Sequence, residues 1–289
     1  MIVDAHLHLF PPAFASRRGR LLEQEPYFAT LFADPRSPLA AAEQLVEILD
    51  ADGIDVALAC GFPWRDAGRA REHNDYLLEC ARLWPGRIVA LAAVDPLSPG
   101  CAREAERALA AGAAGLGEIG AYHDDLGNPA VLEPLVGLAG LCAEAGRPLL
   151  LHTNEPLGHR YPGKSPMTLG GLARLLERCP DTRFQLAHLG GGIFFFAWLR
   201  RGMHRLLHNC IADTAAQPFL YRPRVLRYLL ESGVPLCLGT DWPLLRLDRY
   251  RKEFALAGLD AGSLQGLLGD TAASFWGLQQ PARAGVAPG

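Results

Sequence analysis

The sequence has no long apolar run, no marked excess of charge and no closely spaced cysteine pair. It contains no run of about 18 apolar residues, so we predict no membrane-spanning helix. Its 28 Lys and Arg nearly balance its 31 Asp and Glu, which favours neither nucleic acid nor an anionic membrane as a partner. The first residues, MIVDAHLHLF, lack the cationic start and apolar core of a signal peptide.

The seven cysteines are dispersed, and none belongs to a CxxC motif. An odd, scattered set is typical of reduced thiols and argues against a disulfide framework or a zinc knuckle. We therefore predict a cytoplasmic protein whose partner is a small-molecule substrate. The oligomeric state is left open, with a homo-oligomer as one option.

Short apolar segments alternate along the chain with amphipathic segments rich in Ala, Leu and Arg. The apolar segments predict eight strands, at 2–8, 55–61, 88–95, 115–120, 148–153, 183–190, 206–213 and 235–241. The amphipathic segments predict helices at 39–52, 101–112, 131–145, 170–178 and 222–232. Several of these helices are followed by a glycine suited to a helix C-cap: Gly53, Gly112, Gly146 and Gly233.

Eight strands that alternate with helices predict an α/β fold, a single (β/α)8 TIM barrel. A doubly wound open sheet is the alternative, but no GxGxxG turn follows the first strand. We expect one domain over 1–278, with a long proline-rich loop at 10–38 beside the mouth of the barrel. We expect residues 279–289 to form a loose C-terminal tail.

Ionisable residues interrupt these apolar strands near their C-terminal ends. Asp4, His6 and His8 alternate along the first strand, and a period of two predicts that they share one face. The fourth, fifth, sixth and eighth strands end on Glu118, His152, His188 and Asp241. In a barrel these ends meet at one rim, where a divalent cation offsets the cost of burying ionisable groups together. The predicted metal ligands are His6, His8, Glu118, His152, His188 and Asp241.

Simpler interpretations exist for each residue taken alone. A single histidine in a strand is more often a hydrogen-bonded core residue than a ligand, and an HxH pair can arise by chance. Asp4 either orients a ligand histidine from behind or caps a turn. The remaining histidines are expected in surface or structural roles, with His159 as an exception because of the loop that contains it.

Six motifs spread over nearly the whole chain carry a family resemblance. They are VDAHLHLF (3–10), GEIG (117–120), LLHT (150–153), LAHLGG (186–191), LGTDWP (238–243) and GDTAASFWGL (269–278). In this order they resemble the amidohydrolase superfamily, specifically its amidohydrolase 2 branch of non-oxidative decarboxylases and small-lactone hydrolases. The resemblance implies that His6, His8 and His152 ligate a metal, with Asp241 as a ligand or as the acceptor of a proton from metal-bound water. It leaves His188 to ligate a second metal or to polarise a substrate carbonyl.

The number of metals depends on Glu118. Many superfamily members bridge two metals with a carboxylated lysine at this position, and TatD-like nucleases use glutamate there, whereas the decarboxylase branch works with one metal. A packing role for Glu118 is a further option. We expect one divalent ion, zinc by the nature of its ligands, with a second ion left open.

Substrate contacts are expected from the loop at 153–168, which directly follows a predicted ligand. The candidates are Asn154, His159, Arg160, Tyr161 and Lys164 in this loop, and Trp242 next to Asp241. An ordinary solvated loop is the alternative, and Trp242 either lines a pocket or packs in the core.

The expected activity is hydrolysis of an amide, ester or lactone by metal-activated water, with Asp241 and His188 as catalytic residues. The alternative is non-oxidative decarboxylation of an aromatic or unsaturated acid, in which Asp241 or His188 supplies a proton to carbon. A barrel that binds metal or ligand without turnover is the third option.

Overall fold

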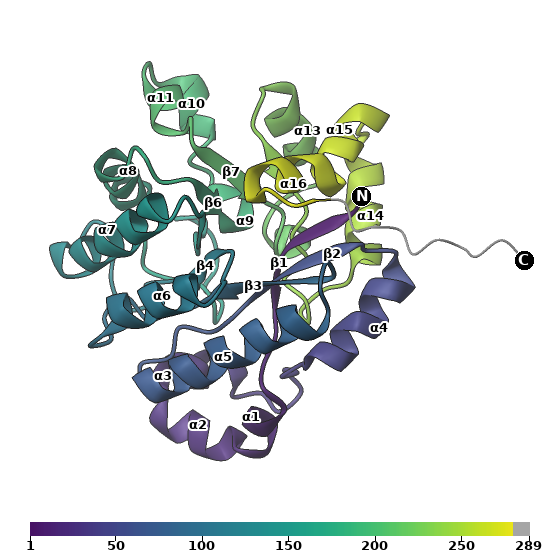
Figure 1. The fold of residues 1–289 in the computed structure, drawn as a ribbon. Helices are drawn as coiled ribbons and strands as arrows, with labels where there is room; N and C mark the ends of the chain where they lie inside the picture. Colours follow the sequence, from purple (N-terminus) through teal and green to yellow (C-terminus); the bar gives the residue numbers. More distant parts are fainter. Residues whose placement is uncertain (280–289) are drawn as a thin grey trace, which may run out of the picture.

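The chain folds into a barrel of eight parallel strands surrounded by helices, as the computed structural model of residues 1–279 shows (Figure 1). The strands are β1 (Val3–His8), β2 (Val56–Cys60), β3 (Ile88–Ala92), β4 (Gly115–Ile119), β5 (Leu149–Leu151), β6 (Phe184–Leu186), β7 (Cys210–Asp213) and β8 (Leu236–Cys237). They pair in chain order, and the segment at β8 returns to β1, where Ala5 N donates to Leu238 O over 2.8 Å. The predicted (β/α)8 barrel is confirmed. The tail expected at 279–289 lies, from residue 280 on, outside the described residues.

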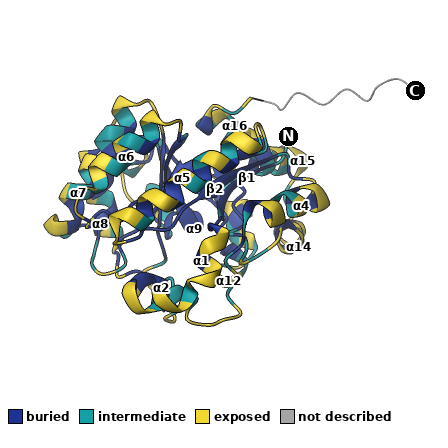
Figure 2. Cartoon of the chain, turned by 60° about the horizontal axis from the view of Figure 1, so that its bottom comes forward, coloured by how far each residue is buried: buried dark blue, intermediate teal, exposed yellow. Residues whose placement is uncertain are grey.

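Helices cover the outside of the barrel, each with a buried side toward the strands and an exposed side toward solvent (Figure 2). The longer ones are α4 (Ala42–Asp52), α5 (Ala67–Leu83), α6 (Cys101–Ala110), α7 (Pro129–Glu144), α8 (Leu169–Arg178), α13 (Arg224–Glu231) and α14 (Leu247–Ala257). The shorter ones are α9 (Ala187–Gly190), α10 (Phe195–Leu199), α11 (Met203–Leu206), α12 (Gln217–Leu220), α15 (Ala261–Gln265), the π-helical turn η1 (Gly266–Asp270) and α16 (Thr271–Trp276). Among the described residues, no helix combines the length and apolar character needed to cross a membrane.

The alternation of side chains along each strand divides the apolar core into two layers. Val56, Leu58 and Cys60 of β2 belong to the cluster inside the barrel, together with Leu91 of β3 and Leu150 of β5. The intervening residues of β2 belong to the larger cluster between strands and helices. Most polar side chains that face inward lie at or just beyond the C-terminal ends of the strands, and Gln185 in β6 is a buried exception that bonds to the Ala5 carbonyl and to Asp213.

The first strand departs from this alternation, and the prediction that Asp4 shares a face with His6 and His8 is wrong. The pairing of β1 with β2 shifts register between Asp4 and Leu7. Ala5 lies in the inner cluster, whereas Asp4 lies on the outer side near Leu7 and Leu45. There its carboxylate accepts hydrogen bonds from Thr240, 2.9 Å from the backbone nitrogen and 2.5 Å from the hydroxyl. The irregularity turns His6 toward the axis and Asp4 away from it.

The segment at 10–38 is not the irregular loop that its prolines suggest. It forms three short helices, α1 (Pro12–Ser16), α2 (Arg18–Gln24) and α3 (Pro26–Phe32). Pro12 and Pro26 stand at the first helical positions, where a missing N–H costs nothing and the fixed φ favours the helix. The segment carries Phe10, Phe14, Tyr27 and Phe28 into an aromatic cluster completed by Phe62 and Trp64.

Candidate metal centre

Six side chains at the C-terminal end of the barrel form two groups of possible metal ligands, here called the first and second triads. The first triad is His6, His8 and Asp241, and the second is Glu118, His152 and His188. Within each triad the candidate ligand atoms all lie within 4.8 Å of one another. The structure thus brings together all six ligands that the sequence predicts.

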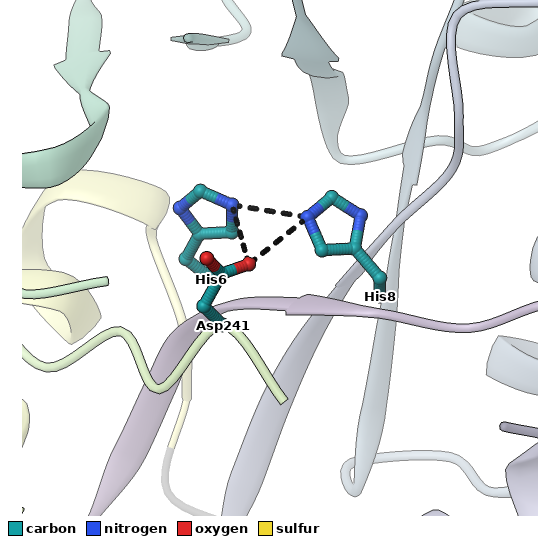
Figure 3. Close-up of side chains that lie close together, drawn as sticks. All are labelled: His6, His8 and Asp241. Carbon is teal, nitrogen blue, oxygen red and sulfur yellow. Dashed lines mark hydrogen bonds and ion pairs between the residues drawn. The ribbon is translucent and has the colours of Figure 1, made fainter. Parts of the chain in front are cut away.

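The first triad joins the end of β1 to the segment that follows β8 (Figure 3). His6 Nε2 lies 3.3 Å from His8 Nε2, and Asp241 Oδ1 lies 3.4 Å from His8 Nε2 and 4.0 Å from His6 Nε2. Two imidazole nitrogens this close repel each other unless a proton or a cation lies between them. The arrangement suits a cation better, because a carboxylate oxygen faces the same point.

Glu118 belongs to the second triad but also lies close to the first. Its Oε1 is 2.8 Å from His152 Nδ1 and 3.6 Å from His188 Nε2 within the second triad. The same oxygen is 3.8 Å from His6 Nε2, and Oε2 is 3.7 Å from His8 Nε2. The Glu118 side chain is 7% exposed, so its charge is buried, and the imidazoles of both triads lie within 4 Å of it.

The histidines of the two triads are anchored by their outer ring nitrogens to hydrogen-bond acceptors. His6 Nδ1 lies 3.0 Å from the carboxylate of Asp213, and His188 Nδ1 lies 2.8 Å from the carbonyl of Ala215. Carboxylates and carbonyls only accept, so each of these nitrogens carries the hydrogen. In the neutral rings, Nε2 then has a free lone pair, and in both residues Nε2 faces Glu118.

The other two histidines follow the same pattern. His8 Nδ1 lies 3.3 Å from the carbonyl of Gly61, and His152 Nε2 lies 3.0 Å from the carbonyl of Gly163. Their inner nitrogens, His8 Nε2 and His152 Nδ1, face the carboxylates of the triads. Four imidazole lone pairs and two carboxylates are a donor set for a divalent transition metal, with outer partners that set each tautomer. The residues present therefore fit a divalent metal ion.

Asp213 bonds to a histidine of each triad, and the sequence alone does not single it out. It ends β7 and is fully buried, and one carboxylate oxygen accepts from His6 Nδ1 and from Gln185 Nε2 at 2.7 Å. The other oxygen accepts from the backbone nitrogens of His188 and Ala215, each at 3.0 Å. Asp213 thus orients one histidine from each triad. The same signal that marks Glu118, a carboxylate at the end of an apolar strand, was present here.

The ionisable groups of the two triads shift one another's pKa values in the directions expected for a site that binds positive charge. Burial lowers the pKa of His6, but the carboxylates of Asp213 and Glu118 outweigh it and raise that pKa to about 10. Burial also lowers the pKa of His188, but Glu118 and Asp241 outweigh burial and raise that pKa to about 9. Burial raises the pKa of Asp241, but hydrogen bonding to His8 and nearby imidazoles lower it to about 2. Without a metal, protons on the imidazoles supply the charge that a divalent ion provides.

Two of the candidate ligands have backbone conformations that are rare for residues other than glycine. His188 has φ of 54° and Asp241 has φ of 58°, both in the left-handed region. Each is held by a hydrogen bond that its backbone N–H donates, from His188 to Asp213 Oδ1 and from Asp241 to the His6 carbonyl at 2.9 Å. Such backbone strain is concentrated at functional sites in proteins.

The family comparison gives a match over nearly the whole chain. The sequence model of the amidohydrolase family matches residues 3–278. The chain belongs to the amidohydrolase family. The resemblance inferred from the motifs is therefore confirmed. No curated protein sequence matches the chain.

Several solved structures share this amidohydrolase barrel. The 5-carboxyvanillate decarboxylase of Novosphingobium aromaticivorans, complexed with manganese and 4-hydroxy-3-methoxy-5-nitrobenzoic acid, is 17% identical, with a TM-score of 0.73 and 96% of each chain covered. The 2,6-dihydroxybenzoate decarboxylase of Rhizobium is 19% identical, with a TM-score of 0.70 and 96% of this chain and 98% of that chain covered. The 4-oxalomesaconate hydratase of Rhodopseudomonas palustris is 16% identical, with a TM-score of 0.60 and 96% of each chain covered. At these identities the likeness shows the fold.

The loop at 153–168, predicted to contact substrate, is largely occupied with contacts to itself. Asn154 is buried and bonds to Ser165, and both Tyr161 Oη and Lys164 Nζ lie 2.9 Å from the carboxylate of Glu155. The other two candidates in the loop, His159 and Arg160, are exposed.

Trp242, the remaining candidate for substrate contact, does not face the triads. Its side chain is 7% exposed and belongs to the outer hydrophobic core, beside Leu7 and Leu45. An aromatic side chain that does reach a ligand is Tyr122, which follows β4. Its ring centroid lies 4.9 Å from that of His152 and 5.2 Å from that of Tyr27 in the aromatic cluster.

Proposed function

We propose that the chain is a metal-dependent lyase that removes the carboxylate of an aromatic acid as CO2, without oxidation. Convergence of four oriented imidazoles and two carboxylates at the end of the barrel is the observation that carries the proposal. The names of the structural relatives support the decarboxylase, since two of them act on hydroxylated benzoic acids. The aromatic cluster supports an aromatic substrate, because it extends through Tyr27 and Tyr122 to the ligand His152.

The proposed cofactor is a divalent cation, with zinc and manganese as the candidates. A bound divalent cation supplies a Lewis acid that binds the substrate carboxylate and compensates its charge. Imidazole nitrogens favour zinc, whereas manganese is the ion named for one of the similar decarboxylase structures. His6, His8 and Asp241 of the first triad would hold such an ion, and Glu118 would lie close enough to take part.

In the proposed reaction His188 is the proton donor. Its Nδ1–H is fixed on the carbonyl of Ala215, so Nε2 is the nitrogen that exchanges a proton with the substrate. The proton goes to the ring carbon that bears the carboxylate, the bond between that carbon and the carboxylate breaks, and its electron pair restores the aromatic ring. The products are CO2 and the aromatic ring with a hydrogen in place of the carboxylate. Asp241, whose pKa is lowered to about 2, remains an anion throughout.

A second candidate function is hydrolysis of an ester, lactone or amide, and the position of Glu118 favours it. A carboxylate within 4 Å of histidines from both triads suits two ions that share it, and a pair of ions activates water. In that case Asp241 accepts the proton of the attacking water.

One panel of substrates separates the two functions. The protein, loaded with Zn2+ or with Mn2+, is given aromatic carboxylic acids, lactones and amides, and CO2 release is measured alongside hydrolysis. The proposal predicts CO2 from an aromatic acid, with His188→Asn reducing kcat by about a hundredfold or more at unchanged metal content. Hydrolysis of a lactone or amide with no CO2 from any acid would replace the decarboxylase by the hydrolase.

A further inference from the structure

One of the candidate ligands is oriented by the loop at 153–168 rather than by the barrel itself. His152 directly follows β5, and its Nε2–H donates to the carbonyl of Gly163, 11 residues further along the chain. The acceptors for His6 and His188 instead lie on or next to β7. The orientation of His152 therefore depends on how the loop at 153–168 is folded.

Asn154, at the start of the loop at 153–168, is hydrogen-bonded to Ser165 near the end of the loop. Its side-chain oxygen accepts from Ser165 twice, 2.9 Å from the backbone nitrogen and 2.7 Å from the hydroxyl. Its side-chain amide donates to the carbonyl of Ser165 at 3.3 Å. Asn154 is 1% exposed, so these bonds face no competition from water. The hydrogen bonds between Asn154 and Ser165 are here called the clasp. Because Ser165 is two residues from Gly163, the clasp holds in place the carbonyl that orients His152.

A second set of contacts closes the outer part of the same loop. The carboxylate of Glu155 accepts from Lys164 Nζ and from Tyr161 Oη, both at 2.9 Å. Lys164 also donates to the carbonyl of Leu157 at 2.8 Å. These polar residues of the loop thus bond to one another, and the hydrogen bond from His152 to the Gly163 carbonyl connects the loop to the candidate ligand.

Asn154 also contacts the loop that carries His188. A side-chain carbon added at Gly191 would lie 2.4 Å from the carbonyl oxygen of Asn154, and Gly191 has φ of +60°. Only glycine permits this approach, so the turn after His188 packs directly on the backbone of Asn154. One residue therefore lies against both loops that supply histidines to the second triad.

We propose that Asn154 is a positioning residue of the metal centre, which holds His152 and His188 in place instead of contacting the substrate. The inference rests on the proposed metal centre. Asn154, Tyr161 and Lys164 are hydrogen-bonded to other groups of the same loop. The inference therefore assigns them to supporting the ligands rather than to binding the substrate.

The test compares Asn154→Ala with Asn74→Ala, a matched control. Asn74 is also 1% exposed, accepts from the backbone nitrogen of Ala93 at 2.9 Å and donates to the Ala93 carbonyl at 3.2 Å, but it touches no candidate ligand. Each variant is titrated with Co2+, and binding is followed through the visible absorption of the ion and by calorimetry. We expect Asn154→Ala to weaken binding about 10- to 100-fold and Asn74→Ala to leave it unchanged, although both lower the melting temperature.

Each other outcome contradicts a specific claim. If the wild-type protein binds no Co2+, the proposed metal centre is itself contradicted. Wild-type binding with equal affinities for the two variants would overturn the role of Asn154 and leave the metal centre intact. An Asn154→Ala variant that binds Co2+ normally but has a raised KM would make Asn154 a substrate contact. Ser165→Ala, which removes one bond of the clasp, serves if Asn154→Ala does not fold: we expect affinity weakened about threefold, and unchanged affinity would contradict the proposal.

Discussion

The Nδ1–H of His6 donates to the carboxylate of Asp213 over 3.0 Å, and both side chains are fully buried. The partners come from β1 and β7, which are neighbours only through β8. The second oxygen of Asp213 accepts from the backbone nitrogen of His188 at 3.0 Å. One carboxylate, which is not itself a candidate ligand, thus connects the two triads.

Replacing this carboxylate therefore tests how far the ligands depend on their outer partners. In Asp213→Asn an amide occupies the same volume, but it accepts fewer hydrogen bonds and holds His6 less firmly. We expect metal affinity to fall about 10- to 100-fold, measured by calorimetry. Asp55→Asn is the control, because Asp55 accepts from the backbone nitrogen of Ile2 at the other end of β1. Equal affinities of the two variants would contradict the proposed role of Asp213.

The pH dependence of stability has opposite signs with and without metal. The pKa of His6 is raised to about 10 in the folded protein from an ordinary value of 6.5, and that of His188 to about 9. In the metal-free protein their stabilisation is complete below pH 6.5 and is lost as the pH rises through about 9 to 10. A metal bound at His6 must displace the proton of that imidazole, so metal affinity increases over the same range.

Melting temperatures of metal-free and Zn2+-loaded protein measure this difference. We expect the gain from metal to grow between about pH 6 and about pH 8, while the metal-free protein becomes less stable. A gain that is constant or that shrinks over this interval would mean that the imidazoles are not the ligands.

Gly239, just after β8, leaves no room for a side chain beside the first triad. A side-chain carbon there would lie 2.8 Å from His6 Cβ and 3.2 Å from Asp213 Cβ. We expect Gly239→Ala to lower the free energy of unfolding by about 1–3 kcal/mol and to weaken metal binding, because His6 must move. The control is Gly137→Ala in α7, where nothing lies within 4 Å and where a gain of about 0.5–1 kcal/mol is expected. Urea unfolding of both variants gives the comparison.

Asp241 tests the chemistry as distinct from the binding of the ion. Asp241→Asn keeps the size of the side chain and one oxygen toward His8 but removes the negative charge of the first triad. We expect much of the metal to remain and turnover to fall by about a hundredfold or more, measured as kcat beside the metal content. Full activity in this variant would remove Asp241 from the mechanism.

Much of the barrel and all six candidate ligands could be predicted from the sequence, because the signals are local. Each strand is a short apolar run, and residues such as His152 and Asp241 stand out at or just beyond its end. Pro26 shows the limit of this reasoning: a proline counted as a loop former begins α3, since its position within the helix decides its effect.

What could not be predicted depends on contacts between distant segments. Asp4 was placed with the histidines because its spacing fits a regular strand, and the register shift that turns it outward arises from pairing with β2. The role of Asp213 requires knowing that His6 faces it from another strand. Lys164 and Tyr161 have the chemistry to bind a substrate, but the folded loop places Glu155 between them.

The central claim is that a divalent metal ion binds at the end of the barrel among His6, His8, Glu118, His152 and Asp241, beside the proton donor His188. The most direct test is elemental analysis of purified wild-type protein, after loading with Zn2+ or Mn2+ and dialysis, beside a His6→Ala, His152→Ala double variant that breaks both triads. The account predicts at least one equivalent of metal per wild-type chain and almost none in the folded double variant. A folded wild-type protein that retains no metal, or a double variant that retains as much, would contradict it.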